Sequence, residues 1–85
     1  MKIIYSSKFE KEYRKLPTKV KRKAEFLEDI FRKNPHDTRL KTHKLKGVLS
    51  DFYAFSIDFQ YRIIFEFKES GTIWFHSVGT HDIYD

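Results

Sequence analysis

Two histidines and one arginine have the side chains best suited to chemistry in this chain. His43 stands in a basic stretch, Arg62 near the start of an apolar alternating segment, and His81 close to the last residue. Histidine can act as acid or base near neutral pH, and arginine offers a permanently charged fork for a phosphate. Cleavage of RNA by its own 2′-OH requires a base for that hydroxyl, an acid for the leaving 5′-oxygen and positive charge near the phosphorane. The three residues therefore suit phosphodiester chemistry on RNA, for which no metal is needed.

Each candidate residue also has a structural interpretation. His43 can be an ordinary loop histidine, and Arg62 can pair with Glu66 or Asp58 across a sheet. His76, inside an apolar segment, fits a hydrogen-bonded structural residue better than a catalyst. The residue types alone leave these alternatives open.

The sequence contains no pattern typical of a metal or cofactor site. The histidines, at positions 36, 43, 76 and 81, lack the spacing of metal ligands, and there is no cysteine. The three glycines form no phosphate-binding loop. We therefore expect neither a metal nor a cofactor. The lack of cysteine and of any long apolar run also predicts a cytoplasmic protein with no membrane partner.

The charge is distributed unevenly along the chain. Residues 1–47 carry 15 Lys and Arg against 6 Asp and Glu, whereas residues 48–85 carry 2 against 6, and the formal net charge is +5. A basic half beside an acidic half suits a polyanionic partner, although a lysine-rich solubilising surface has the same composition. The length predicts a single domain, residues 1–85.

The N-terminal half reads as a strand followed by two helices. Residues 2–5 are apolar and β-prone, and Ser7 with Glu10 has the spacing of a capping box, which predicts a helix from Ser7 to about Lys15. Pro17 suits the first turn of a second helix, which Asn34 and the following proline end. One face of this helix is apolar, with Val20, Ala24, Leu27 and Phe31 at its centre. The lysines and arginines of its other faces suit either solvent or a phosphate backbone.

Residues 36–47 have no clear period and read as an exposed basic loop. The loop holds four cations that are candidates for binding RNA: Arg39, Lys41, Lys44 and Lys46.

The C-terminal half alternates with a period of two, which predicts three antiparallel strands in a meander. If odd-numbered residues of the first two strands lie opposite one another, one face of the sheet is apolar and can be covered by the helices. This face holds Tyr53, Phe55, Ile57, Ile63, Phe65 and Phe67. The other face, expected to be open, small and polar, holds Ala54, Ser56, Asp58, Arg62, Ile64 and Glu66. The fold class is thus α+β, with an N-terminal strand and a two-helix hairpin on one face of an antiparallel sheet. Gly79 would let the chain bend and bring His81 back toward Arg62 and Ser56.

Three stretches resemble the RelE/ParE superfamily of bacterial toxins, most closely its YafQ-like branch. They are residues 42–47 (THKLKG), 61–65 (YRIIF) and 78–82 (VGTHD), and with the helical hairpin the resemblance covers nearly the whole chain. It implies the RelE-like fold and a ribosome-dependent endoribonuclease, the toxin of a type II toxin-antitoxin system. Its substrate would be mRNA in the ribosomal A site, and a cognate antitoxin protein would neutralise it.

The resemblance also implies roles for individual residues. His81 matches the terminal catalytic histidine, His43 the loop histidine, and Arg62 the phosphate-binding arginine, with Lys44 or Lys46 assisting. Tyr84 lies near the aromatic end of such toxins and would stack on a base. Ser56 and Ala54 replace a strand histidine and a nearby aspartate of this branch, which leaves the identity of the general base open.

Two other functions are compatible with the same features. ParE-like members inhibit DNA gyrase and cut nothing, and a non-catalytic RNA- or ribosome-binding module would need the basic residues but no histidine. Replacement of the strand histidine would also fit a toxin of low activity.

Overall fold

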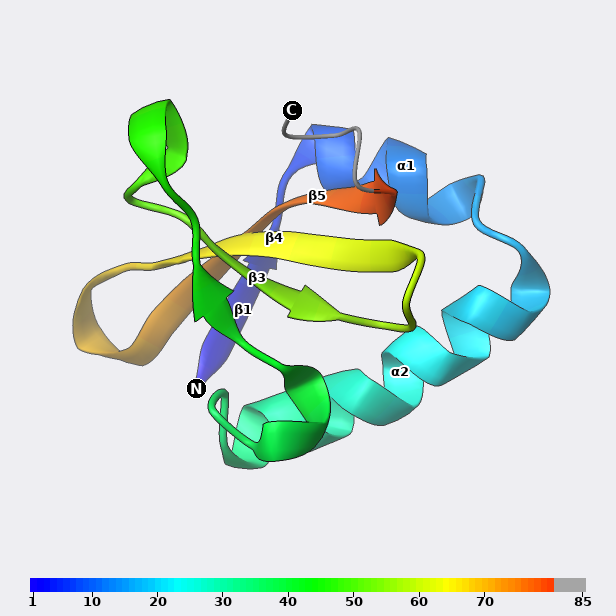
Figure 1. Cartoon of the computed structure of the whole chain (residues 1–85), viewed down its shortest axis with the longest axis horizontal. Helices are drawn as coiled ribbons and strands as arrows, with labels where there is room; N and C mark the ends of the chain where they lie inside the picture. Colours follow the sequence, from blue (N-terminus) through cyan, green and yellow to red (C-terminus); the bar gives the residue numbers. More distant parts are fainter. Residues whose placement is uncertain (81–85) are drawn as a thin grey trace.

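A five-stranded sheet with two helices on one face makes up the structure (Figure 1). The computed structural model describes residues 1–80. The strands are β1 (Lys2–Tyr5), β2 (His43–Lys44), β3 (Tyr53–Ser56), β4 (Tyr61–Phe67) and β5 (Thr72–Thr80), in the spatial order β1-β5-β4-β3-β2. Strands β2 to β5 pair antiparallel, whereas β1 pairs parallel to β5 and makes the sheet mixed. The α+β fold class is confirmed, with this one parallel edge as the difference from the expected antiparallel sheet.

The helices begin and end close to the predicted positions. Helix α1 spans Ser7–Arg14 and α2 spans Thr18–Lys33. The N-cap of α1 is Ser6, whose Oγ accepts a hydrogen bond from the Phe9 N–H at 2.9 Å, so the predicted cap at Ser7 was one residue late. Pro17 is the N-cap of α2, and its missing N–H costs nothing there.

Phe31 is the centre of the core between the sheet and α2. Its side chain is fully buried, and its ring lies 5.1, 4.9 and 5.4 Å from the rings of Phe55, Phe65 and Phe75. These separations are typical of favourable aromatic pairs. Tyr53 lies opposite Phe65 and Phe55 opposite Ile63, which confirms the predicted inner face of β3 and β4.

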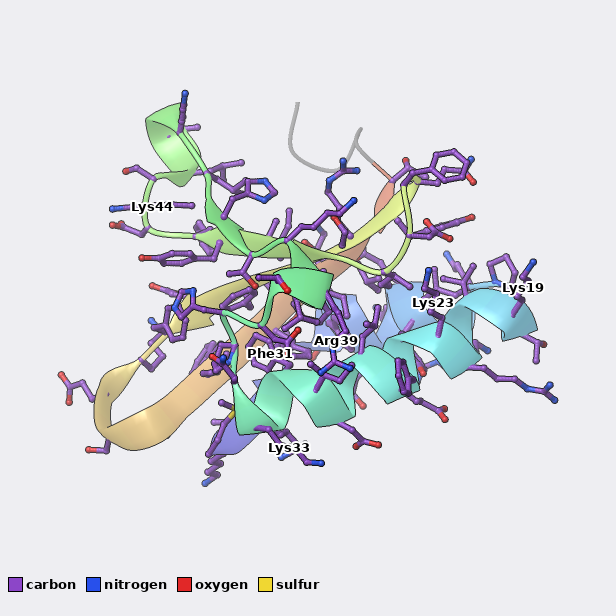
Figure 2. All side chains as sticks on the ribbon, turned by 60° about the horizontal axis from the view of Figure 1, so that its bottom comes forward. Lys19, Lys23, Phe31, Lys33, Arg39 and Lys44 are labelled. Carbon is purple, nitrogen blue, oxygen red and sulfur yellow. The ribbon has the colours of Figure 1, made fainter. Side chains whose placement is uncertain are left out.

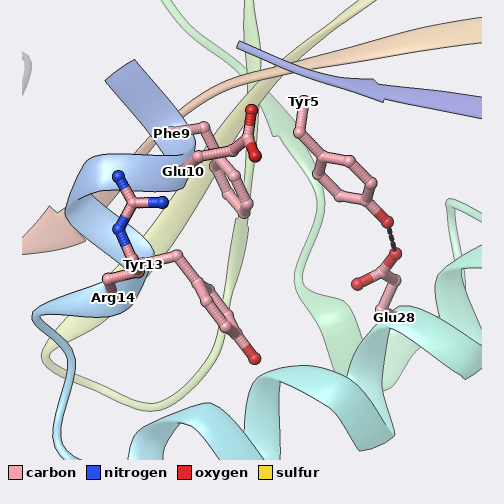
Figure 3. Close-up of a pocket in the computed structure, with 6 residues that line it drawn as sticks. All are labelled: Tyr5, Phe9, Glu10, Tyr13, Arg14 and Glu28. Atoms are coloured by element: carbon pink, nitrogen blue, oxygen red, sulfur yellow. Dashed lines mark hydrogen bonds between the residues drawn. The ribbon is translucent and has the colours of Figure 1, made fainter. Parts of the chain in front are cut away.

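A hydrogen bond also ties the N-terminal strand to α2. The hydroxyl of Tyr5 donates to Glu28 (Figure 3). Arg32 contacts both groups. Figure 3 also shows Phe9 and Tyr13 of α1 beside Tyr5. These residues help to line a hollow of about 300 Å³. Together these contacts hold the helical layer against β1.

Residues 36–47 are more ordered than the predicted loop. A short 3₁₀ helix, Thr38–Leu40, precedes β2, which adds two residues to the edge of the sheet beside β3. Leu40 is fully buried and Leu45 nearly so, and these two side chains anchor the middle of the segment, residues 40–45. The prediction of an irregular exposed loop was therefore wrong in its middle, because two leucines bury enough apolar surface to hold it.

The outer face of the sheet is only partly open, contrary to expectation. Ala54 and Ile64 are buried beneath Leu45, with Leu49 and Phe52 packed against them as a second apolar cluster. The chain reaches this position through the segment after β2, which includes the short 3₁₀ helix Gly47–Leu49. This cover leaves the end of the face around Ser56 and Arg62 as the accessible polar region.

Candidate anion-binding site

Arg62 lies on β4 between two small residues. It is opposite Ser56 of β3 on one side and opposite Gly79 of β5 on the other. Ser56 and Ala54 are two apart along β3, so Arg62, Ser56 and Ala54 share the outer face of the sheet. The arginine side chain therefore rises from the sheet with no bulky neighbour on either adjacent strand.

Two nitrogens of the Arg62 guanidinium are buried without a partner among the described residues. Its Nε and Nη1 atoms are shielded from solvent, and neither makes a hydrogen bond in the part of the chain that the structure describes. A buried polar group that lacks a hydrogen bond costs about 1–3 kcal/mol, and a charged one costs more. Such an orphaned charged fork fits a site that is completed by an anion with paired oxygen acceptors.

A groove of about 480 Å³ opens beside Arg62, and we call it the Arg62 groove. It lies where the start of β4 meets α2 and the segment after α2. The residues that line it are Lys23, Leu27, Arg39, Lys41, Ser56, Ile57, Asp58, Phe59 and Arg62. Four of these side chains are cationic and one is anionic, so the groove favours negatively charged ligands.

The single acidic residue among the described residues that line the groove has a structural role. Asp58 Oδ1 accepts hydrogen bonds from the backbone N–H groups of Gln60 and Tyr61, both at 2.8 Å, and so holds the turn between β3 and β4. Among residues 1–80 it forms no ion pair with Arg62 within 4 Å. Within the described residues, the structure therefore does not support the alternative in which Arg62 pairs with Asp58.

Two of the groove's cations come from the segment after α2. Arg39 is bound by both oxygens of Asp37 at 2.9 Å, and these hydrogen bonds lower the pKa of Asp37 to about 2. Lys41 has a left-handed backbone with φ of 53°, which an L residue adopts at a cost. Strain of this kind is often found where a side chain or carbonyl must be aimed at a site.

His43 lies on the same face of the sheet as Arg62, two strands away. It is opposite Ala54, which shares its face with Ser56 and Arg62. From strand spacing and rise, the Cα atoms of His43 and Arg62 are about 12 Å apart. The His43 side chain is exposed, and its Nδ1 lies 3.0 Å from the carbonyl oxygen of Lys41.

The remaining lysines predicted to bind RNA lie elsewhere. Lys44 is opposite Tyr53 and so has the parity of the inner face, while Lys46 is exposed in the segment after β2. Neither lines the Arg62 groove. His81 and Tyr84 are outside the described residues. Strand β5 pairs with β4 up to Thr80 opposite Tyr61, next to Arg62.

His76 takes part in a satisfied network away from the groove. Its Nε2 lies 3.1 Å from Glu66 Oε1, and its ring meets the ring of Phe52 edge to face at 4.7 Å. Burial disfavours the charged form of Glu66, but the hydrogen bonds from His76 and Lys68 outweigh it and lower the pKa of Glu66. The pairing of Glu66 with Lys68 and His76 also removes it as a partner for Arg62.

Phe59 was missed as a site residue from the sequence, and Lys23 was not singled out from the helix cations that suit either solvent or a phosphate backbone. Lys23 is one of many helix lysines, and only the packing of α2 against the turn after β3 brings it to the groove. Phe59 had a usable signal, because a large aromatic side chain at the tip of a predicted turn has no core to enter. It is 89% exposed.

Comparison with solved structures identifies the fold. The YoeB/ParE toxin from Agrobacterium tumefaciens superposes with a TM-score of 0.82 at 18% identity, over 95% of this chain and 99% of that one. YafQ from E. coli gives a TM-score of 0.80 at 20% identity, over 96% and 94%. The chain has the RelE-like fold. A third RelE-like neighbour is the heterotetrameric YoeB-YefM toxin-antitoxin complex from Staphylococcus aureus, with a TM-score of 0.77 at 21% identity over 95% and 97%.

The other comparisons give no match. No protein-family model matches the chain, and a search of curated proteins finds no significant relative. Within residues 1–80, no cluster of three or more histidine, cysteine or acidic side chains is placed to hold a metal ion. Likewise, no helix in that range is both long and apolar enough to cross a bilayer.

Proposed function

We propose that this protein is the toxin of a type II toxin-antitoxin system and an endoribonuclease that cleaves mRNA in the ribosomal A site. The observation that carries the proposal is Arg62 at the wall of a cationic groove, with its Nε and Nη1 atoms buried and without a hydrogen bond among residues 1–80. The RelE-like fold shared with the YafQ and YoeB toxins supports it. We further propose attack by the 2′-OH of the substrate itself, with no metal.

Arg62 would bind the scissile phosphate. Its fork donates to the non-bridging oxygens, whose negative charge increases as the phosphorane forms, so that the interaction is stronger in the transition state than with substrate. Lys41 and Lys23, which line the same groove, add positive charge. Ser56, directly opposite Arg62, would contact the RNA without adding bulk.

His43 suits the role of general base. The Lys41 carbonyl can only accept, so His43 Nδ1 donates the proton of this contact, and the neutral ring then leaves Nε2 unprotonated. The unprotonated nitrogen is the one that can take a proton from the 2′-OH. The resemblance implies a catalytic role for His81, which would then protonate the leaving 5′-oxygen, and stacking of Tyr84 on a base.

A cognate antitoxin would be the protein partner. The YoeB toxin from Staphylococcus aureus forms a complex with YefM, which supports a proteinaceous antitoxin for this chain. A segment that covers the Arg62 groove should be acidic, because it must compensate Lys23, Lys41 and Arg62.

Expression of the protein without an antitoxin tests the proposal. A nuclease stops translation and leaves mRNA cut at codon positions, which primer extension maps to single nucleotides. Double-strand DNA breaks with cell filamentation and intact mRNA would instead indicate gyrase inhibition. Binding of RNA with no cleavage would leave only the non-catalytic module.

A further inference from the structure

We propose that Phe59 and two lysines of α2, Lys19 and Lys23, form a second subsite that binds single-stranded RNA next to the phosphate at Arg62. The subsite adjoins the groups proposed to perform the chemistry and shares Lys23 with them. It extends the proposed function and rests on RNA being the substrate.

A second groove adjoins the Arg62 groove. It has a volume of about 550 Å³ and runs between the beginning of α2 and the turn that connects β3 to β4. It is lined by Pro17, Lys19, Val20, Lys23, Asp58, Phe59, Gln60 and Tyr61. Lys23, Asp58 and Phe59 line both grooves, so the two meet at this turn.

Phe59 presents an aromatic ring to solvent from a held turn. The side chain is 89% exposed, although a phenylalanine gains free energy from burial. The two hydrogen bonds that Asp58 Oδ1 accepts fix the backbone of Gln60 and Tyr61, so the ring stands on a defined turn. An exposed aromatic ring in a basic groove is the arrangement that proteins use to stack on bases of single-stranded nucleic acid.

The charges of the two grooves specify the partner. Lys19 and Lys23 stand at one end of α2, while Lys33 stands at the other, as Figure 2 shows. Lys19 and Lys23 form a cationic path past Phe59 together with Lys41 and Arg62. Among residues 1–80, Asp58 is the one acid that lines either groove. A run of acidic residues would satisfy the cations but supplies no ring to stack on Phe59. A single strand of RNA supplies both phosphates and stacking bases.

Binding of a short fluorescein-labelled single-stranded RNA, followed by fluorescence anisotropy, tests the subsite. Phe59→Ala is compared with Phe26→Ala, which removes a phenylalanine that is 59% exposed on α2 and lines neither groove. Lys23→Gln is compared with Lys33→Gln on the same helix. Thermal midpoints confirm that each variant folds, and polyglutamate serves as the competing acidic chain.

Phe59→Ala should raise the Kd for RNA about 5-fold or more, the lower end of what loss of one stacked base costs, and Phe26→Ala should not. Lys23→Gln should reduce the slope of log K against log salt by about 0.7, the value for one single-strand phosphate contact. Equal binding by the Phe59→Ala and Phe26→Ala variants overturns the subsite. The subsite is also overturned if Phe59→Ala binds RNA like the wild type and loses only its affinity for the competing polyglutamate.

The proposed function fails in a different way. If the wild-type protein binds RNA through Phe59 but leaves translated mRNA uncut, the nuclease is wrong and the subsite stands. If the wild-type protein cuts mRNA and Phe59→Ala binds and cuts like the wild type, only the subsite is wrong.

Discussion

Ser56 and Arg62 face each other across β3 and β4 on the side of the sheet away from the helices. The serine is short, and Gly79 flanks Arg62 on β5, so the guanidinium has room on both sides. Two of its nitrogens are nevertheless buried without a hydrogen bond among the described residues. This arrangement favours ligand binding over stability, and it leads to the first prediction.

Arg62→Met should stabilise the protein while it removes the proposed phosphate contact. Methionine keeps most of the apolar stem and eliminates the two unsatisfied donors, so the free energy of unfolding should rise by about 1–3 kcal/mol. Urea denaturation measures this change. Arg39→Met is the control, because Arg39 is exposed and its bonds are made to Asp37. A clear loss of stability in Arg62→Met would show that the guanidinium is satisfied in solution.

His43→Gln and His76→Gln should separate catalysis from structure. The first removes the proposed base and should lower mRNA cleavage by about 10²-fold or more. The second removes the ring that packs on Phe52 and weakens the contact with Glu66, which should cost about 1–2 kcal/mol of stability with cleavage largely kept. Cleavage rates on ribosomes and urea unfolding of both variants check this. The reverse pattern would make His76 the active histidine.

Leu45→Ala should loosen the segment that carries the groove's cations. Leu45 is 7% exposed and packs with Ala54 and Ile64, so its truncation should cost about 2–3 kcal/mol. Because the segment from Arg39 to β2 is then held mainly at Leu40, RNA affinity should fall too. Val48→Ala, at a fully exposed side chain, should leave the free energy of unfolding within about 0.5 kcal/mol of the wild type. Equal stability of the two variants would refute the anchor role.

Stability should fall at alkaline pH partly through Tyr5. Burial, and then the hydrogen bond and charge of Glu28, raise the pKa of Tyr5 from 10 to about 12. The neutral phenol is therefore favoured in the folded state. Its contribution is complete below pH 10 and is lost as the pH rises toward 12. Urea unfolding of the wild type and of Tyr5→Phe at pH 8 and pH 11.5 measures this. Relative to Tyr5→Phe, the wild type should have a lower free energy of unfolding at pH 11.5 than at pH 8. A constant difference would contradict this account.

Local patterns in the sequence predicted most of the secondary structure. The period of two in β3 and β4 gave the inner face correctly, because a buried face imposes strict alternation. The apolar stripe with Phe31 gave α2 and its core face. The cap at Ser6 instead of Ser7 is a one-residue error, since adjacent serines offer the same oxygen.

Long-range pairings were beyond the sequence. The parallel pairing of β1 with β5 joins segments about 70 residues apart and leaves no local pattern. The cover of Ala54 and Ile64 depends on where Leu45 returns to the sheet, which the spacing does not reveal. The site shows the same division: Arg62 was recognisable as an arginine out of place in an apolar strand, whereas Lys23 joins the groove only through tertiary packing.

Primer extension on a message translated in vitro, with wild-type or Arg62→Met protein, tests the central claim most directly. The account predicts cuts at codons in the ribosomal A site with the wild type and none above background with the folded Arg62→Met variant. Equal cutting by both proteins would contradict it.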